Sequence, residues 1–283
     1  MAERIVVTGA TGNVGRVLVP LLSAAGVHVR AVTRDPAAAG LPAGVDVVRA
    51  DLLDAATLDA AFAGADAVFL VWPAYSTDHA APVVDAIARH ARRVVFLSAL
   101  GAPDSTVAEP PPGLFHGRLE WLIRRTSLEW TFLRAGGFAT NTLGWAAEIR
   151  ESGTVHWIYG GAGRSLIHEA DIAAVAARVL TERGHAGASY ELTGPSVVTQ
   201  TEQVRLIGEA IGRPLRWVEL PEEDARARMR EMGWSPEFIE GGLAHWAHIV
   251  GEPEPVTDTV EKLTGTPARS FAQWAGEHVG AFS

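Results

Sequence analysis

The sequence RIVVTGATGNVGR, residues 4–16, decides the fold. It begins with a short apolar run, Arg4–Thr8, that is typical of a buried strand, and it leads into the helical pattern Asn13–Ala25. Glycine at every third position between them allows a tight turn and the close approach of a pyrophosphate to the start of a helix. The stretch predicts a Rossmann-type dinucleotide site, with a purely structural turn as the alternative. The residues assigned to this site are Gly9, Thr11, Gly12, Asn13, Val14 and Gly15.

The end of the next expected strand, Val27–Thr33, selects between the two dinucleotides. An NAD site usually places an acidic residue there to accept a hydrogen bond from the ribose. This chain has Thr33 and Arg34 instead, and arginine pairs well with the 2′-phosphate that only NADP carries. Two alternatives stay open, because Asp35 suits an NAD ribose in part and Arg34 also suits a solvated loop. NADP(H) is the expected cofactor.

Outward from this stretch, the first half of the chain alternates apolar runs with helical patterns. Such alternation indicates an α/β fold with a doubly wound parallel sheet covered on both faces. We expect residues 1–150 to form an NADP(H)-binding Rossmann-type domain. We expect residues 151–283 to complete the sheet and to form a smaller, mostly helical C-terminal substrate lobe, packed with the first domain as one unit.

The expected elements follow from the same patterns. The further strands are expected at Asp46–Arg49, Ala67–Val71, Arg93–Ser98, Glu129–Arg134, Trp157–Tyr159, Leu166–His168, Tyr190–Thr193 and Leu215–Glu219. The further helices are expected at Ala55–Phe62, Ala80–His90, Phe115–Arg125, Ile172–Leu180, Glu202–Ile211 and Glu222–Met232. A loop with consecutive prolines is expected over Ala99–Leu114, and Thr199 with Glu202 is expected to cap one of the later helices.

The amino-acid composition excludes several classes of function. The 283 residues contain no cysteine, which excludes disulfides, thiolate metal sites and cysteine nucleophiles. The net charge of −9 argues against nucleic-acid binding. No apolar run is long enough to span a bilayer and no signal peptide is expected, so we expect a cytoplasmic protein without membrane contact, as a monomer or homodimer. No metal site is expected, because the spacing of His245 and His248 does not suit metal ligation.

Several segments together resemble the NmrA-like branch of the atypical short-chain dehydrogenase/reductase family, which includes NAD(P)H:quinone reductases and redox-sensing regulators. The matching segments are Thr8–Arg16, Phe96–Ala99, His116–Leu122, Trp130–Arg134, Gly136–Asn141, Ile167–Ala173 and Tyr190–Pro195. The resemblance implies that Asp51 and Leu52 contact the adenine ring, with an aspartate that simply ends its strand as the alternative for Asp51. It also implies that the backbone around Gly136 and Phe138 meets the nicotinamide. Trp72 is assigned to the cofactor site and is also a candidate to line the substrate cleft. The candidate substrate residues are Tyr75, Asn141 and Trp145.

The chain departs from the family where catalysis is concerned. Its tyrosines, Tyr75, Tyr159 and Tyr190, have no lysine four residues later, so the Tyr-x-x-x-Lys dyad of classical members is absent. His116 stands on the corresponding helix, and a histidine that titrates near neutrality is able to protonate a substrate oxygen. Glu120 either orients the His116 ring or pins the helix to its neighbours, and His116 itself either acts on substrate or satisfies a loop carbonyl.

Ser98, at the end of its strand, is the second candidate catalytic residue and is expected either to hydrogen-bond a substrate oxygen or to have a simple strand-end role. These features favour an NADPH-dependent reductase that transfers hydride to a quinone, an enone or an aromatic carbonyl on a small molecule. The alternative is a non-catalytic NADP(H) sensor that binds a protein partner. A sugar-nucleotide epimerase or dehydratase is disfavoured, because those members keep the dyad.

Overall fold

The computed structural model describes residues 3–103, 108–111 and 114–283. The chain divides into two compact units. Unit 1 comprises Met1–Ala135, Glu169–Leu192 and Thr259–Thr266, and unit 2 comprises Gly136–His168, Thr193–Asp258 and Pro267–Ser283.

Unit 1 is built on a seven-stranded parallel sheet in the order β3-β2-β1-β4-β5-β6-β9. The strands in that order are Asp46–Arg49, His28–Thr33, Arg4–Val7, Ala67–Leu70, Arg93–Ala99, Glu129–Ala135 and Ala188–Leu192. The strand order reverses between β1 and β4, and in such sheets ligands bind at the carboxyl ends of the strands beside that point. The expected doubly wound fold is confirmed.

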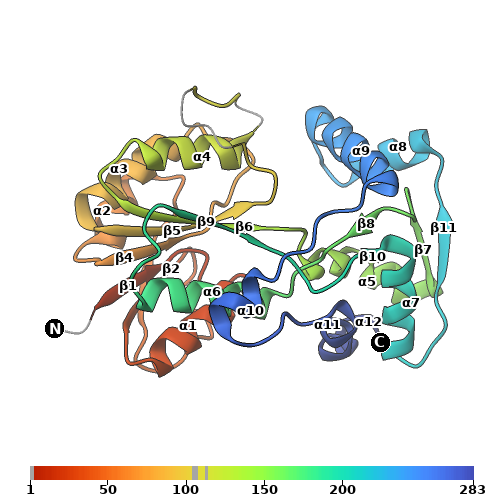
Figure 1. The fold of residues 1–283 in the computed structure, drawn as a ribbon, viewed down its shortest axis with the longest axis horizontal. Helices are drawn as coiled ribbons and strands as arrows, with labels where there is room; N and C mark the ends of the chain where they lie inside the picture. Colours follow the sequence, from red (N-terminus) through yellow and green to blue (C-terminus); the bar gives the residue numbers. More distant parts are fainter. Residues whose placement is uncertain (1–2, 104–107, 112–113) are drawn as a thin grey trace. The chain divides into compact units, whose positions relative to one another are not determined.

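Helices cover both faces of this sheet, as Figure 1 shows. One face carries α2 (Leu58–Phe62), which follows a 3₁₀ turn at Ala55–Thr57, together with α3 (Ala80–His90) and α4 (Phe115–Arg124). The other face carries α1 (Gly15–Ala24), α6 (Glu169–Thr181) and α10 (Thr259–Thr264). Because both faces are covered, a central strand such as β4 is buried along its whole length.

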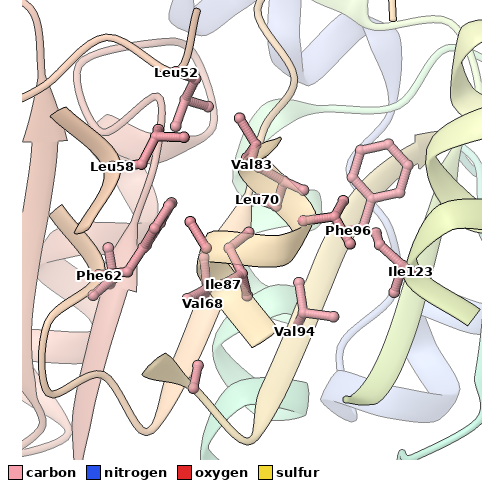
Figure 2. Packing of buried hydrophobic residues seen from close by; sticks show 14 of the residues in the cluster. Leu52, Leu58, Phe62, Val68, Leu70, Val83, Ile87, Val94, Phe96 and Ile123 are labelled. Atoms are coloured by element: carbon pink, nitrogen blue, oxygen red, sulfur yellow. The ribbon is translucent and has the colours of Figure 1, made fainter. Parts of the chain in front are cut away.

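One hydrophobic core of unit 1 lies between the sheet and α2, α3 and α4. Its side chains interdigitate between Phe62 at one end and Phe96 and Ile123 at the other (Figure 2). Fully burying one side chain of this size contributes about 1.5–3 kcal/mol. This core fixes the carboxyl ends of β4 and β5, together with α4, as a rigid base.

Unit 2 consists of helices and two small sheets. One sheet pairs β7 (Thr154–Trp157) with β11 (Arg216–Glu219) in parallel, and the other pairs β8 (Gly163–Arg164) with β10 (Val198–Thr199) in antiparallel orientation. The helices are a 3₁₀ segment at Ala139–Trp145, α5 (Ala146–Ser152), α7 (Gln200–Ala210), α8 (Glu222–Glu231), α9 (Pro236–Gly251), α11 (Phe271–Glu277) and α12 (Val279–Phe282). Thr199 caps α7 as expected, because its side chain accepts a hydrogen bond from the Glu202 backbone.

Candidate functional site

The glycine loop between β1 and α1 is folded tightly against itself. Gly9 has a φ of +60°, a conformation that favours glycine, and its carbonyl accepts a hydrogen bond from the Gly12 N–H at 2.9 Å. A methyl group at Gly15 would lie 2.2 Å from the Gly9 oxygen, so the helix packs directly on the loop backbone. The local geometry therefore requires glycine at positions 9 and 15.

The start of α1 is suited to an anionic group. Val14 occupies the N-cap position, no side chain caps the helix, and its first turn contains no acidic residue. The N–H groups and positive dipole end of the helix are therefore not neutralised by a carboxylate. Together with the missing side chain at Gly12, this arrangement fits the pyrophosphate of a dinucleotide.

Thr8 anchors the loop at the point where the strand order reverses. Its fully buried hydroxyl donates to the Phe69 carbonyl at 3.1 Å and accepts from the Val71 N–H at 2.7 Å. These bonds join β1 to the end of β4 beyond the last paired residue of β1. We did not predict this role, and a buried threonine directly before the first loop glycine is the signal that points to it.

The residues after β2 bear on the choice of cofactor. The Asp35 carboxylate accepts from the N–H groups of Ala37 at 3.1 Å and Ala38 at 3.4 Å. The Asp35 N–H in turn donates to the Thr33 hydroxyl at 3.3 Å. This turn engages one Asp35 oxygen locally, while Arg34 is exposed. The arrangement favours Arg34 rather than Asp35 as the group that meets the ribose substituent.

The residues assigned to the adenine ring follow β3. The Asp51 carboxylate accepts from the Leu53 N–H at 3.0 Å, and the Asp51 N–H donates to the Thr57 hydroxyl at 3.2 Å. Leu52 is buried in the core of unit 1. The local bonds hold the Asp51 carboxylate at the carboxyl end of β3, and the adenine contact stays a prediction.

A buried ion pair joins β5, β6 and α4. Glu120 on α4 is only 1% exposed, and Arg134 on β6 binds both of its carboxylate oxygens, with Nε 2.9 Å from Oε1 and Nη2 2.6 Å from Oε2. The Ser98 hydroxyl on β5 donates to the same Oε1 at 2.7 Å. Of the two interpretations of Glu120, the structure supports the one in which it pins the helix to its neighbours.

The hydrogen bond that Ser98 donates to Glu120 determines how this serine is able to bind a ligand. Because its single proton is donated to a carboxylate, the Ser98 oxygen acts toward any further group as a hydrogen-bond acceptor. It is therefore poorly suited to stabilise a negatively charged substrate oxygen, and its expected contact with a substrate oxygen stays a prediction.

His116 lies among aromatic rings at the start of α4. Its ring centroid is 4.0 Å from that of Phe115 and 6.2 Å from that of Phe96. Burial lowers the pKa of His116 from 6.5 to about 4, since the charged form is poorly solvated there. At neutral pH the imidazole is uncharged. The expectation that it titrates near neutrality is wrong, and the desolvation by packing that overturns it is not visible in the sequence.

Trp72 and Tyr75 follow β4, at the edge of the sheet where the carboxyl ends of the strands lie. The buried Trp72 indole N–H donates to the Ser76 carbonyl at 2.9 Å, and Tyr75 is 73% exposed. Gly136, Phe138, Asn141 and Trp145 belong to unit 2, where Asn141 is exposed and Trp145 packs in the core with its ring edge-on to Trp217 at 5.9 Å. Their predicted contacts with cofactor and substrate stay predictions.

In the described part of the chain, no helix is long and apolar enough to cross a membrane. No group of three or more histidine and acidic side chains in the described ranges is arranged to hold a metal ion.

Comparisons with known proteins bear on the same site. Residues 9–183 match the model of a family described as NAD(P)H-binding. The chain is 38% identical to the (4-alkanoyl-5-oxo-2,5-dihydrofuran-3-yl)methyl phosphate reductase of Streptomyces griseus, over 99% of each chain. It is 36% identical to the NAD(P)H azoreductase of Xenophilus azovorans, over 98% of this chain and 99% of that one.

A solved structure is similar over the same length. The NADPH-dependent quinone oxidoreductase of Escherichia coli, solved in complex with NADPH, superposes with a TM-score of 0.78 at 27% identity. The match covers 96% of this chain and 99% of that one. The similarity includes the sheet and helices that carry the glycine loop.

Proposed function

The chain belongs to the NAD(P)H-binding family whose model matches residues 9–183, and from this we propose that it is an NADPH-dependent reductase of quinones, enones or aromatic carbonyls. The expected relationship to NmrA-like reductases agrees with this membership. Relatives over nearly the whole chain are named as reductases of a furanone phosphate and of azo compounds, and a solved neighbour is a quinone oxidoreductase. None of these names favours the sensor alternative.

One observation favours quinones and enones among these acceptors, namely the uncharged state of His116. An isolated carbonyl becomes a strongly basic alkoxide on reduction and needs a proton donor close at hand. The reduced oxygens of a quinone or a conjugated enone are much weaker bases and take their proton from water. A site with a neutral imidazole and no tyrosine–lysine dyad suits the second kind of acceptor.

The glycine loop and the uncapped start of α1 would hold the cofactor pyrophosphate, and Arg34 would pair with the 2′-phosphate. NADPH, when bound, supplies a hydride, so that two electrons and one hydrogen pass to the acceptor and NADP⁺ remains. The neutral His116 would donate one N–H hydrogen bond to the acceptor oxygen that gains charge. Ser98, as an acceptor, would receive a hydrogen bond from an N–H or O–H group of the bound ligands.

The proposed function is tested by following NADPH oxidation at saturating NADPH with quinones, enones and simple aliphatic ketones. We expect turnover with the quinones and enones, and at most weak turnover with aliphatic ketones. Tight NADPH binding without turnover of any acceptor would overturn the proposal and support a sensor. Faster turnover of aliphatic ketones than of quinones would contradict the acceptor class.

A further inference from the structure

Tyr75 presents an aromatic ring to solvent from a segment that is held in place. It is 73% exposed, which is unusual for so large a ring in a folded protein. The segment around it is fixed, because the buried Trp72 indole N–H bonds to the Ser76 carbonyl at 2.9 Å. The Ser76 hydroxyl donates in turn to the Asp78 carboxylate at 2.6 Å. The segment that carries the ring is thus held by hydrogen bonds of the residues on both sides of Tyr75.

The Tyr75 ring continues into the rings at the start of α4. Tyr75 and Phe115 meet edge to face, with centroids 5.9 Å apart and planes at 85°. Phe115 lies against His116, with centroids 4.0 Å apart and planes at 35°. We call Tyr75, Phe115 and His116 the aromatic ledge. Two segments that are distant in sequence form it, on the carboxyl side of β4 and β5.

The ledge has a shape that a planar ligand fits. Rings at a large angle to each other form a corner in which a flat ring stacks on one and meets the edge of the other. Two successive centroid steps of 4.0 and 5.9 Å make the ledge longer than one six-membered ring. Since His116 is uncharged at neutral pH and the other two rings are apolar on their faces, the ledge favours an uncharged ligand.

We propose that the aromatic ledge holds the distal ring of a fused-ring acceptor, so that the substrates of this protein are planar acceptors with two or more fused rings. The inference rests on the proposed reductase function and narrows its substrate class. A single-ring acceptor that reaches His116 covers part of the ledge, whereas a fused bicyclic acceptor covers a second ring as well. Tyr75 is then a specificity-determining residue.

The test compares 1,4-naphthoquinone with 1,4-benzoquinone as acceptors at saturating NADPH. For each acceptor, kcat/KM of Tyr75→Leu and of Tyr75→Phe is divided by the wild-type value, so that the intrinsic reactivity of the quinone cancels. The absence of cysteine helps here, because no protein thiol adds to the quinones. Leu21→Ala, which truncates a side chain 40% exposed on α1, is the matched surface control.

We expect Tyr75→Leu to lower kcat/KM for naphthoquinone by about three- to tenfold, the size of one aromatic stacking contact, through KM rather than kcat. The value for benzoquinone changes less than twofold. Tyr75→Phe keeps the ring and stays close to wild type, as does Leu21→Ala. Equal losses for both quinones, or a loss in Tyr75→Phe as large as in Tyr75→Leu, would overturn the ledge proposal while the reductase function stands.

A binding measurement separates the two proposals if the wild type reduces neither quinone. Binding of 2-naphthol and of phenol to the NADP⁺-saturated protein is measured by titration calorimetry. The ledge predicts that Tyr75→Leu raises the Kd for 2-naphthol about three- to tenfold and the Kd for phenol less than twofold. These losses would support the ledge even if the reductase function failed, which requires that no quinone, enone or aromatic carbonyl is reduced. Unchanged 2-naphthol binding would overturn the ledge.

Discussion

Arg134 binds both carboxylate oxygens of Glu120 in the interior of unit 1, at 2.9 and 2.6 Å. This pair joins the end of β6 to α4, one helical turn beyond His116. Ser98 adds the end of β5 to the same carboxylate. The Glu120 carboxylate thus positions three elements that border the proposed site.

Glu120→Gln is expected to destabilise the protein strongly. The change leaves the Arg134 guanidinium, whose side chain is 11% exposed, without its bidentate carboxylate. Breaking a buried pair from one side costs about 3–5 kcal/mol. The matched control is Glu129→Gln, which removes an exposed pair with Arg92 at 3.7 Å and is expected to cost less than about 1 kcal/mol. The urea midpoints of the two variants measure this difference, and similar midpoints would contradict it.

The pKa of His116 gives a pH dependence with a definite sign. Burial lowers it from 6.5 in the unfolded chain to about 4 in the folded protein. Between these values the unfolded chain binds a proton that the folded protein does not, so the free energy of unfolding falls as the pH drops from 6.5 toward 4. The contribution, present in full above pH 6.5, reaches up to about 3 kcal/mol.

The measurement compares the wild type with His116→Gln at pH 7 and at pH 4.5. The variant lacks this titration, so the stability difference in favour of the wild type is expected to shrink or reverse at the lower pH. In the wild type, NMR titration of the His116 ring, identified by its absence from the variant, is expected to give a midpoint near 4. A midpoint near 6.5 would restore His116 as a proton donor at neutral pH.

The sequence was sufficient for features that depend on local pattern. The strand-turn-helix around Gly9 and Gly15 and the start of α4 at Phe115 follow from apolar period, glycine spacing and proline. It was insufficient for pairing between distant segments. Leu166–His168 was expected as a strand, yet only Ile167 forms an isolated bridge, with Phe138, because pairing there depends on unit 2 as a whole.

Helix α9 was missed because its sequence is apolar on several sides and contains paired glycines, which obscure the helical period. The available signal was Ser235 before Pro236, and the Ser235 side chain does cap the helix by accepting from the Phe238 N–H. In the site, the identity of Arg134 as the partner of Glu120 and the burial of His116 were missed for a different reason. Both arise from packing between α4 and two strands, and no local pattern encodes them.

Gly15→Ala and Gly276→Ala are expected to have opposite effects. Both residues lie in helices, where alanine is favoured over glycine by about 0.5–1 kcal/mol. At Gly276 no atom lies within 4 Å of the added methyl group, so the helix gains this stability. At Gly15 the methyl group would meet the Gly9 carbonyl oxygen at 2.2 Å, and neither backbone segment yields without disturbing the loop.

Thermal unfolding measures this contrast, with a raised midpoint for Gly276→Ala and a lowered one for Gly15→Ala. The Gly15 variant is also expected to lose NADPH affinity, because the loop and the start of α1 shift apart. A Gly15→Ala protein with wild-type midpoint and affinity would show that the close packing of loop and helix is not needed.

Arg34→Ala is expected to weaken the binding of NADPH without weakening the binding of NADH. If Arg34 pairs with the 2′-phosphate, its loss removes a charge-assisted hydrogen bond of about 1.5–3 kcal/mol, which corresponds to a Kd for NADPH raised roughly 10- to 100-fold. The Kd for NADH, which lacks that phosphate, stays within about twofold. Arg92→Ala is the control, because this exposed arginine lies before β5, at the amino ends of the strands and away from the loop.

Asp35→Ala tests the alternative in which Asp35, rather than Arg34, contacts the ribose of an NAD cofactor. The Asp35 carboxylate is engaged with the Ala37 and Ala38 N–H groups, so its removal is expected to loosen the turn without raising the Kd for NADH relative to that for NADPH. Titration calorimetry with both dinucleotides on the two variants gives the four constants. The opposite result would be an equal loss of affinity for NADPH and NADH in Arg34→Ala, together with a loss of affinity for NADH alone in Asp35→Ala. Asp35 would then be the residue that contacts the ribose, and the cofactor assignment would be reversed.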